Sequence, residues 1–151
     1  MLRLRETPLE SLDLMTPLCN PRAGALVTFE GWVRNHHEGR AVQWLEYQAY
    51  EALADKEGRR IIQEALSRYE ILAVQCAHRV GRVEIGQQAV WIGVTAEHRA
   101  DAFQACRFLI DQIKQRLPIW KKETYVGGES AWVNCQHCGM GEHTHSITSN
   151  L

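Results

Sequence analysis

Basic side chains recur at the ends of predicted elements, and their positions suggest a site for a small anion. Lys114 comes at the end of an amphipathic segment, a proline then interrupts the segment, and Lys121 follows the break. His98 and Arg99 open the same segment, and Arg34 ends an earlier aromatic and β-branched stretch. Such cations hold phosphate and carboxylate groups. Because the net charge is only −1, they favour a small anionic ligand over a long polyanion.

Each of these groups also has an ordinary explanation. A cation in the last turn of a helix, such as Lys114, gains typically about 0.3–1 kcal/mol from the carbonyl ends. Lys121 and Lys122 could be protective lysines of an edge strand. A neighbouring glutamate could neutralise Arg99, and residues 35–40 could form a solvated turn. Spacing alone therefore leaves the site open.

Other reactive residue types are assigned to the core. His78 and Arg79 fall inside a predicted strand and are interpreted as structural, outside the site. Cys76 and Cys106 are expected to pack as small hydrophobic side chains. No Ser-His-Asp arrangement, phosphate-binding loop or dinucleotide glycine motif is present.

Composition limits the class of protein. A chain of 151 residues that is 45% hydrophobic predicts one domain, over residues 1–134, followed by a polar Cys/His-containing tail over 135–151. Seventeen Lys and Arg balance eighteen Asp and Glu, which argues against nucleic acid as a partner. No apolar run approaches the roughly 18 residues of a membrane helix. A charged N-terminus without a signal peptide and an odd count of five cysteines predict a cytoplasmic protein with reduced thiols.

The elements that must position the basic groups follow from hydrophobic periodicity. The predicted order is a short helical segment over 9–15, strands over 25–34 and 42–47, a helix over 49–69, strands over 71–83 and 89–96, a helix over 99–117, and an extended segment over 120–133. The second strand is expected to pair with the first. This order predicts an α+β fold, with helices over a mostly antiparallel sheet.

Three motifs within this order resemble a known family. They are G-x-V-R-x-H, H-R-x-x-A-F and K-x6-K-x-E, in the stretches FEGWVRNHHEGRAVQWLEYQAY, AHRVGRVEIGQQAVWIGVTAEHRADAFQACRFLIDQIKQRLPIWKKE and GGESAWV. Together these stretches cover most of residues 25 to 133, and they are similar to the large, catalytic subunit of molybdopterin synthase. The combination is far more specific than any one motif.

The resemblance implies a fold, an activity and partners. The fold would be an α/β hammerhead with an additional, mostly antiparallel β-sheet. The activity would be that of a sulfurtransferase in molybdenum cofactor biosynthesis, which moves two sulfurs to cyclic pyranopterin monophosphate and so forms the dithiolene of molybdopterin. The donor would be the thiocarboxylated Gly-Gly C-terminus of a small ubiquitin-like sulfur carrier. A homodimer with a carrier at each outer end, a heterotetramer, is implied, with no cofactor required for catalysis.

The resemblance also assigns residues. Lys114 and Lys121 would be catalytic, with Lys114 nearest the carrier's terminal carbonyl. Fixed cations would stabilise the negative charge that grows as sulfur attack opens the cyclic phosphate. The implied substrate-binding residues are Trp32, Val33, Arg34, His98, Arg99, Lys114, Lys121, Lys122 and Glu123.

The C-terminal tail departs from the family. Family members can place a basic residue shortly after the position of Trp132, where it reaches the neighbouring subunit's pocket. Here no Lys or Arg follows Lys122, so that contribution is absent or comes from a histidine such as His137.

The tail also contains metal-ligating residue types. Thiolates and imidazoles at this density suit Zn²⁺, although the gap between the two pairs is shorter than in usual zinc fingers. The alternative is a polar terminus without metal. The candidate ligands are Cys135, Cys138, His143 and His145.

Two other classes of function remain open from the residues. One is a non-catalytic module that binds a phosphate or nucleotide in the same basic pocket. The other is a metal-dependent interaction protein built around the Cys/His tail.

Overall fold

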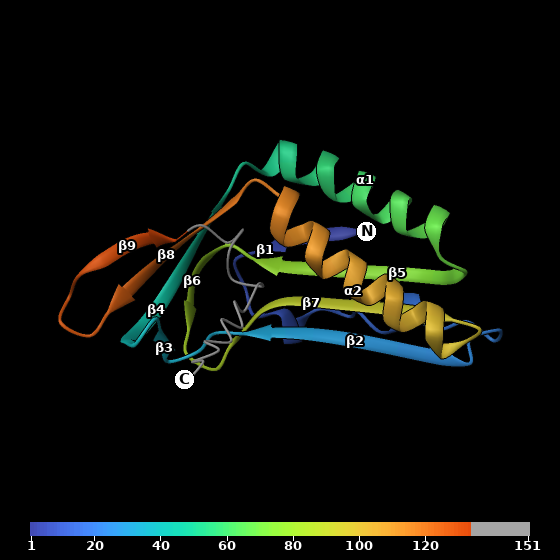
Figure 1. Ribbon diagram of the computed structural model, residues 1–151, viewed down its shortest axis with the longest axis horizontal. Coiled ribbons are helices and arrows are strands. Elements are labelled where there is room, and N and C mark those ends of the chain that lie inside the picture. Colours follow the sequence, from blue (N-terminus) through green and yellow to red (C-terminus); the bar gives the residue numbers. More distant parts are fainter. Residues whose placement is uncertain (134–151) are drawn as a thin grey trace, which may run out of the picture.

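The structure, a computed structural model, describes residues 1–133, which form two β-sheets and two α-helices (Figure 1). No helix within these residues is both long enough and apolar enough to span a membrane. The elements are β1 (Leu2–Arg5), η1 (Leu9–Ser11), η2 (Thr16–Leu18), β2 (Ala25–Trp32), β3 (His36–His37), β4 (Arg40–Ala49), α1 (Glu51–Arg68), β5 (Ile71–Arg79), β6 (Gly81–Glu84), β7 (Gln88–Ala96), α2 (Arg99–Arg116), β8 (Ile119–Tyr125) and β9 (Ser130–Val133).

The first sheet has the strand order β1-β5-β7-β2. Only β1 and β5 pair in parallel; the other neighbours are antiparallel. Both α-helices lie over one face of this sheet (Figure 1). Val74 and Cys76 of β5 share the main apolar cluster with Leu109 and Ile113 of α2. The apolar stripe of α2 therefore fixes the helix on the sheet.

Gly58 has a packing role inside α1. A glycine at mid-helix lowers helix stability by about 1 kcal/mol relative to alanine. Here a Cβ atom would lie 2.5 Å from Cδ2 of Leu2, so only glycine lets α1 approach β1 this closely. The close contact with β1, a strand that the hydrophobic pattern did not predict, explains why residue 58 is a glycine.

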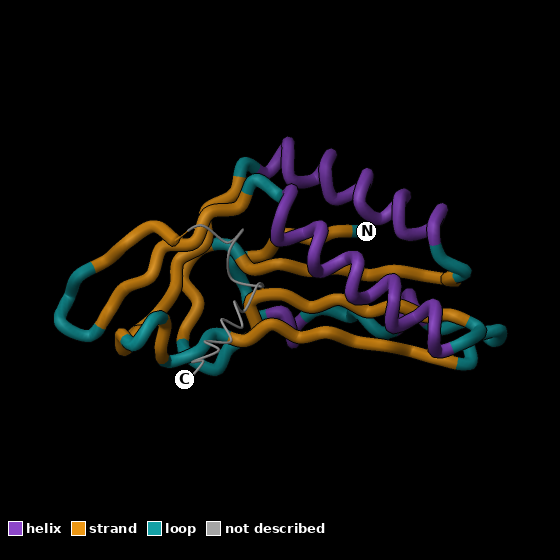
Figure 2. The backbone as a smooth tube through the Cα atoms, viewed as in Figure 1, coloured by secondary structure: helices purple, strands orange, loops and turns teal. Residues whose placement is uncertain are grey.

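The second sheet continues beyond the first (Figure 2). Its order is β3-β4-β8-β9, and β6 also pairs with β4. A separate apolar cluster holds it together and includes Val33, Leu45 and Val83. Pro118 separates α2 from β8, and Leu117 before it is extended, as expected for a residue that precedes proline. The chain thus passes from the helical layer into the second sheet within a few residues.

The predicted fold class is confirmed: the fold is α+β, with an additional antiparallel sheet beside the helix-covered one. Three details were wrong. The strand over 42–47 does not pair with β2; as part of β4 it pairs with β3, β6 and β8. The strand over 71–83 is two strands, because Gly81 has a positive φ of 75° and redirects the chain. β1 was not predicted. The proposed boundary at residue 134 lies outside the described residues.

Candidate active site

A cavity of about 220 Å³ opens where the C-terminal end of α2 meets the second sheet. Ile110, Ile113 and Leu117 of the α2 region form an apolar wall. The polar and aromatic lining comes from both sheets and from α2. These residues are Trp32, Arg34, His36, Tyr47, His78, Lys114, Lys121 and Glu123.

Lys114 lies in the last turn of α2, one turn after the buried Ile110. Its placement follows from the helix register, because Ile110 and Ile113 pack into the core and bring Lys114 to the cavity. Asp111, three residues before Lys114 on α2, accepts a hydrogen bond from Arg107 Nε at 3.0 Å. Lys114 therefore contributes its positive charge to the cavity.

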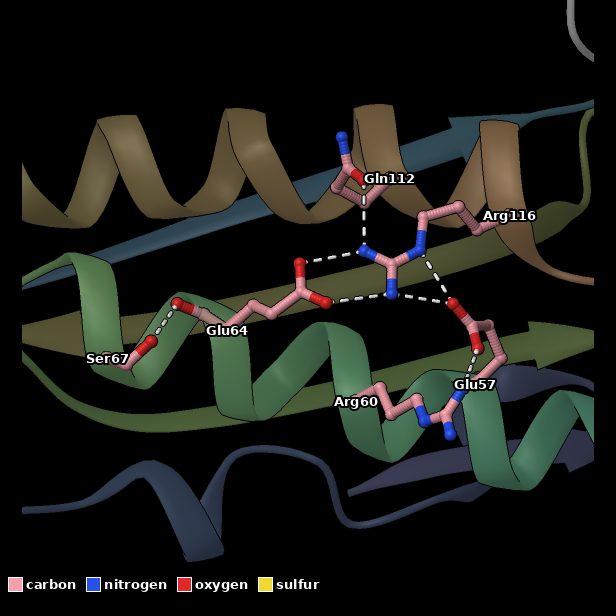
Figure 3. A network of polar contacts seen from close by, with 6 residues as sticks. All are labelled: Glu57, Arg60, Glu64, Ser67, Gln112 and Arg116. Atoms are coloured by element: carbon pink, nitrogen blue, oxygen red, sulfur yellow. Dashed lines mark hydrogen bonds and ion pairs between the residues drawn. The ribbon is translucent and has the colours of Figure 1, made fainter.

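A polar network anchors this end of α2 to α1 (Figure 3). Arg116 donates to Glu57 Oε1 at 2.7 Å and, through two nitrogens, to both oxygens of Glu64 at 2.8 Å. The hydrogen bond to Glu64 raises the pKa of Arg116 and lowers the pKa of Glu64. Because Arg116 lies two residues after Lys114, the network restrains the backbone that carries the lysine.

β8 presents a buried charged face to the cavity. Lys121 is only 8% exposed and Glu123 only 2%. Glu123 Oε1 accepts a hydrogen bond from His37 Nδ1 at 2.8 Å and lies 3.3 Å from Lys121 Nζ; its Oε2 accepts from the Tyr125 hydroxyl at 2.8 Å. Burial alone would raise the pKa of Glu123, but the hydrogen bond from Tyr125 and the charges of Lys121 and His37 outweigh it and lower that pKa. The carboxylate stays ionised beside Lys121.

The end of β2 supplies Trp32 and the loop after it supplies Arg34; both residues line the cavity and are exposed. Val33 between them does not line it. Its side chain is 3% exposed within the apolar cluster of the second sheet, and its N–H donates to the Gln87 carbonyl at 3.0 Å. Val33 thus supports its two neighbours instead of facing a ligand in this cavity.

Lys122 points away from the cavity. Successive side chains of a strand face opposite sides, and Lys122 lies over the Trp132 ring, 5.7 Å from its centroid. β8 is also not an edge strand, since it pairs with β4 and β9. Lys121 and Lys122 therefore have different surroundings, and only Lys121 lines the cavity.

His98 and Arg99 lie at the opposite end of α2 and are exposed. At a rise of 1.5 Å per residue, Arg99 is about 22 Å along the helix from Lys114. Neither residue lines the cavity of its own chain. The expectation that all the basic groups gather in one cavity is therefore wrong within a single chain, because one straight helix separates them.

His78 lines the cavity, contrary to the prediction that it is structural and outside the site. Its Nδ1–H donates to the Arg79 carbonyl at 2.7 Å, and its ring meets Tyr47 edge-on at 5.0 Å. Burial lowers its pKa to about 4; the hydrogen bond to Arg79 opposes this shift and the charge of Lys114 adds to it. One sequence feature could have placed His78 in the site. It alternates with Cys76 along β5, so both side chains lie on the helix-covered face of the sheet.

The two buried cysteines are in the core, as predicted. Burial raises the pKa of Cys76 to about 12 and that of Cys106 to about 11, so neither thiol is a ready nucleophile. Between residues 1 and 133 no group of three or more His, Cys, Asp or Glu could hold a metal ion. The suggested zinc ligands lie outside the described residues, as does His137; the ligands are Cys135, Cys138, His143 and His145.

A second, shallower groove of about 720 Å³ meets the cavity at Lys114. It runs between the end of α2 and the second sheet, and both Trp120 and Trp132 line it. These indoles are 53% and 54% exposed. A groove with two exposed indoles thus adjoins the lysine.

Comparisons with known proteins agree with this architecture. The chain is 42% identical over 129 residues to the molybdopterin synthase catalytic subunit of Thermoplasma volcanium, an alignment that covers 85% of this chain and 94% of the relative. It is 40% identical over 133 residues to the same subunit of Halalkalibacterium halodurans, with 88% and 85% covered.

Solved structures show the same fold. Molybdopterin synthase from Staphylococcus aureus superposes with a TM-score of 0.76 at 33% identity, covering 87% of this chain and 94% of that one. A MoaE protein from Burkholderia ambifaria gives 0.73 at 33% identity, with 91% and 90% covered. A complex of subunits 1 and 2 of molybdopterin-converting factor from Helicobacter pylori shares the fold, with a TM-score of 0.70 at 21% identity over 98% and 99% of the chains.

The model of one protein family matches residues 4–116, which include the end of β1, both α-helices and the other three strands of the first sheet. Together with the relatives, this match confirms the family resemblance. The chain belongs to the MoaE protein family.

Proposed function

We propose that this chain is the catalytic subunit of a molybdopterin synthase and that sulfur transfer takes place in the cavity at the end of α2. One observation carries the proposal: Lys114 and Lys121, on either side of the α2–β8 break, line one cavity together with Arg34. The relatives named molybdopterin synthase catalytic subunit support the activity.

In the proposed reaction, a carrier's thiocarboxylate sulfur attacks cyclic pyranopterin monophosphate and forms a thioester. Water then hydrolyses the bond between the sulfur and the carrier's acyl carbon, which leaves the sulfur on the pterin and a carboxylate on the carrier. A second transfer from another carrier completes the dithiolene. Negative charge grows on oxygen as the cyclic phosphate opens. Arg34, Lys114 and Lys121 stabilise that charge, and a fixed cation in a partly enclosed cavity is worth a few kcal/mol. Glu123 holds Lys121 in place. The carrier brings the sulfur, so the chain needs no nucleophilic thiol and acts by positioning and electrostatics.

We further propose that the groove beside Trp120 and Trp132 receives the carrier's extended tail. The groove reaches the cavity at Lys114, where the terminal thiocarboxylate must arrive. A Gly-Gly end suits a narrow entrance because it has no side chains. A two-subunit complex among the structures of the same fold supports a small partner of this kind.

His98 and Arg99 can take part in substrate binding only from another copy of the chain, given their distance from Lys114. We therefore propose a homodimer in which these residues act at the partner's cavity. Mixing two inactive variants, Lys114→Met and Arg99→Ala, tests this arrangement. With random exchange, about one quarter of the wild-type activity should return, because half of the dimers regain one intact cavity. No recovery in mixed dimers would contradict it.

Two smaller proposals concern location and metal. The described cysteines Cys19, Cys76 and Cys106 are free, which supports a cytoplasmic location. Catalysis is proposed to need no cofactor. Zinc in the tail is tested by metal analysis of the purified chain, with alkylation of Cys135 and Cys138 as the second readout.

A reconstituted assay tests the proposed function. Purified chain is mixed with cyclic pyranopterin monophosphate and with a carrier whose C-terminus is either a thiocarboxylate or a carboxylate. Dithiolene product should form only with the thiocarboxylate. Binding of the pterin without any product would favour the phosphate-binding module instead, and product formation in the absence of this chain would contradict a catalytic role.

A further inference from the structure

Hydrogen-bond donors dominate the charged part of the cavity. Arg34, Lys114 and Lys121 can only donate. The one carboxylate in the lining, Glu123, already accepts from His37 and Tyr125 and lies against Lys121. These cations suit a phosphate, but they cannot accept hydrogen bonds from the N–H groups of a ligand.

His78 has a different hydrogen-bonding character, and its ring is fixed. The side chain is 8% exposed, and Nδ1 lies 2.7 Å from the Arg79 carbonyl oxygen. A carbonyl only accepts, so Nδ1 must carry the proton and Nε2 of the neutral ring has a lone pair. The edge-on contact with Tyr47 restrains rotation of the ring.

Nε2 of His78 belongs to a side chain that lines the cavity. Among the described residues the structure gives this atom no hydrogen-bond partner. The side-chain atoms in residues 1–133 that are both sealed from solvent and unpartnered belong to Gln75, Arg79 and Thr95. Nε2 is not one of them, and its side chain lines the cavity.

We propose that Nε2 of His78 accepts a hydrogen bond from an N–H group of the bound substrate's heterocycle. The inference rests on the proposed function, since a pterin offers amide and amino N–H donors while its phosphate calls for cations. The cavity then separates the two parts of the substrate: Arg34, Lys114 and Lys121 bind the anionic part, and His78 binds the donor edge of the ring. His78 is a substrate-positioning residue that remains neutral because it is buried.

Two substitutions test the acceptor role of Nε2 separately from the Nδ1 hydrogen bond that fixes the ring. In His78→Asn the amide can still donate to the Arg79 carbonyl, but nothing replaces Nε2. In His78→Gln the longer side chain can place its carbonyl near the position of Nε2. Isothermal titration with cyclic pyranopterin monophosphate should give a dissociation constant about tenfold higher for His78→Asn, because a buried donor loses its partner. The value for His78→Gln should stay within about threefold of wild type, well under the 1.4 kcal/mol of a tenfold change.

A spectroscopic readout covers the case in which a variant fails to fold. In ¹⁵N-labelled wild-type protein, Nδ1 of His78 should be protonated and Nε2 unprotonated, and the Nε2 resonance should move when substrate saturates the cavity. An unmoved Nε2 resonance with substrate bound, or equal affinities for folded His78→Asn and His78→Gln, would overturn the inference while leaving the proposed function intact. A wild-type chain that neither binds nor converts the pterin would overturn both.

Discussion

The two ends of α2 both carry basic residues, but their surroundings differ. At the C-terminal end, Lys114 is exposed but lines a cavity, and β8 closes that cavity with Lys121, which is only 8% exposed. At the N-terminal end, His98 and Arg99 are exposed, and the neighbouring Glu97 accepts a hydrogen bond from Arg22 in solvent. The difference teaches that a cation at a helix end lines a cavity only where a second element forms the opposite wall.

The largest effect is expected at the enclosed end. Lys114→Met should lower kcat by about 10²–10³-fold, the range seen when one charge-stabilising donor is removed. Lys56→Met is the matched control, because Lys56 is an exposed lysine of α1. Single-turnover formation of dithiolene measures both. Equal activity of the two variants would remove the distinction between the cavity lysine and a surface lysine.

The adjacent lysines of β8 sharpen the comparison within one strand. Lys121→Met should lower kcat/KM by about 10–100-fold, because it removes one cavity cation and leaves Glu123 without that partner. Lys122→Met should have little effect, since Lys122 faces Trp132 on the other side of the strand. If Lys122→Met were the more damaging change, the substrate would lie on the opposite face of β8.

Two arginines of α2 differ in their contacts: Arg116 anchors α2 to α1, whereas Arg107 makes an ion pair on the surface. Arg116→Met should lower the free energy of unfolding by about 1 kcal/mol, because hydrogen bonds to two charged partners are lost from a partly buried network. Arg107→Met removes only an exposed pair with Asp111 and should have a smaller effect. Urea denaturation measures both. A comparable loss in the two variants would mean that the α1–α2 network contributes no more than a surface pair.

The smallest effect is expected on the free energy of unfolding at acidic pH. Glu123 has a lowered pKa in the folded chain, so its contribution to stability is present above the unfolded pKa and is lost as pH falls through the folded one. The stability difference between wild type and Glu123→Gln should therefore shrink as pH falls below about 4.5. Glu97→Gln, at the exposed end, should show a weaker dependence, because a solvent-exposed pair contributes little. Urea denaturation from pH 7 to pH 4 and below follows both variants, and identical profiles would contradict a special role for the buried carboxylate.

Local patterns predicted the elements better than their pairing. The apolar stripe that includes Leu109 and Ile113, with Pro118 after it, was enough to predict α2. Pairing is non-local: β4 pairs with β8, and α1, β5, β6, β7 and α2 lie between them in the chain. β1 was missed because its arginines, Arg3 and Arg5, hide the apolar alternation of Leu2 and Leu4.

The site was predictable in part. The resemblance correctly brought Arg34, Lys114 and Lys121 together, which helix and strand patterns alone could not do across the turn at Pro118. The same reasoning could not place Arg99, because a motif does not say which copy of a chain it serves. His78 was missed because a histidine inside a strand was interpreted as core; it is buried and also lines the cavity.

A crystal structure with bound cyclic pyranopterin monophosphate tests the central claim most directly. We expect the phosphate to lie within hydrogen-bond distance of Lys114, Lys121 and Arg34, in the cavity between α2 and the second sheet. A ligand held on the outer face of β8, or at the exposed end of α2 without contact to any cavity of this kind, would contradict it.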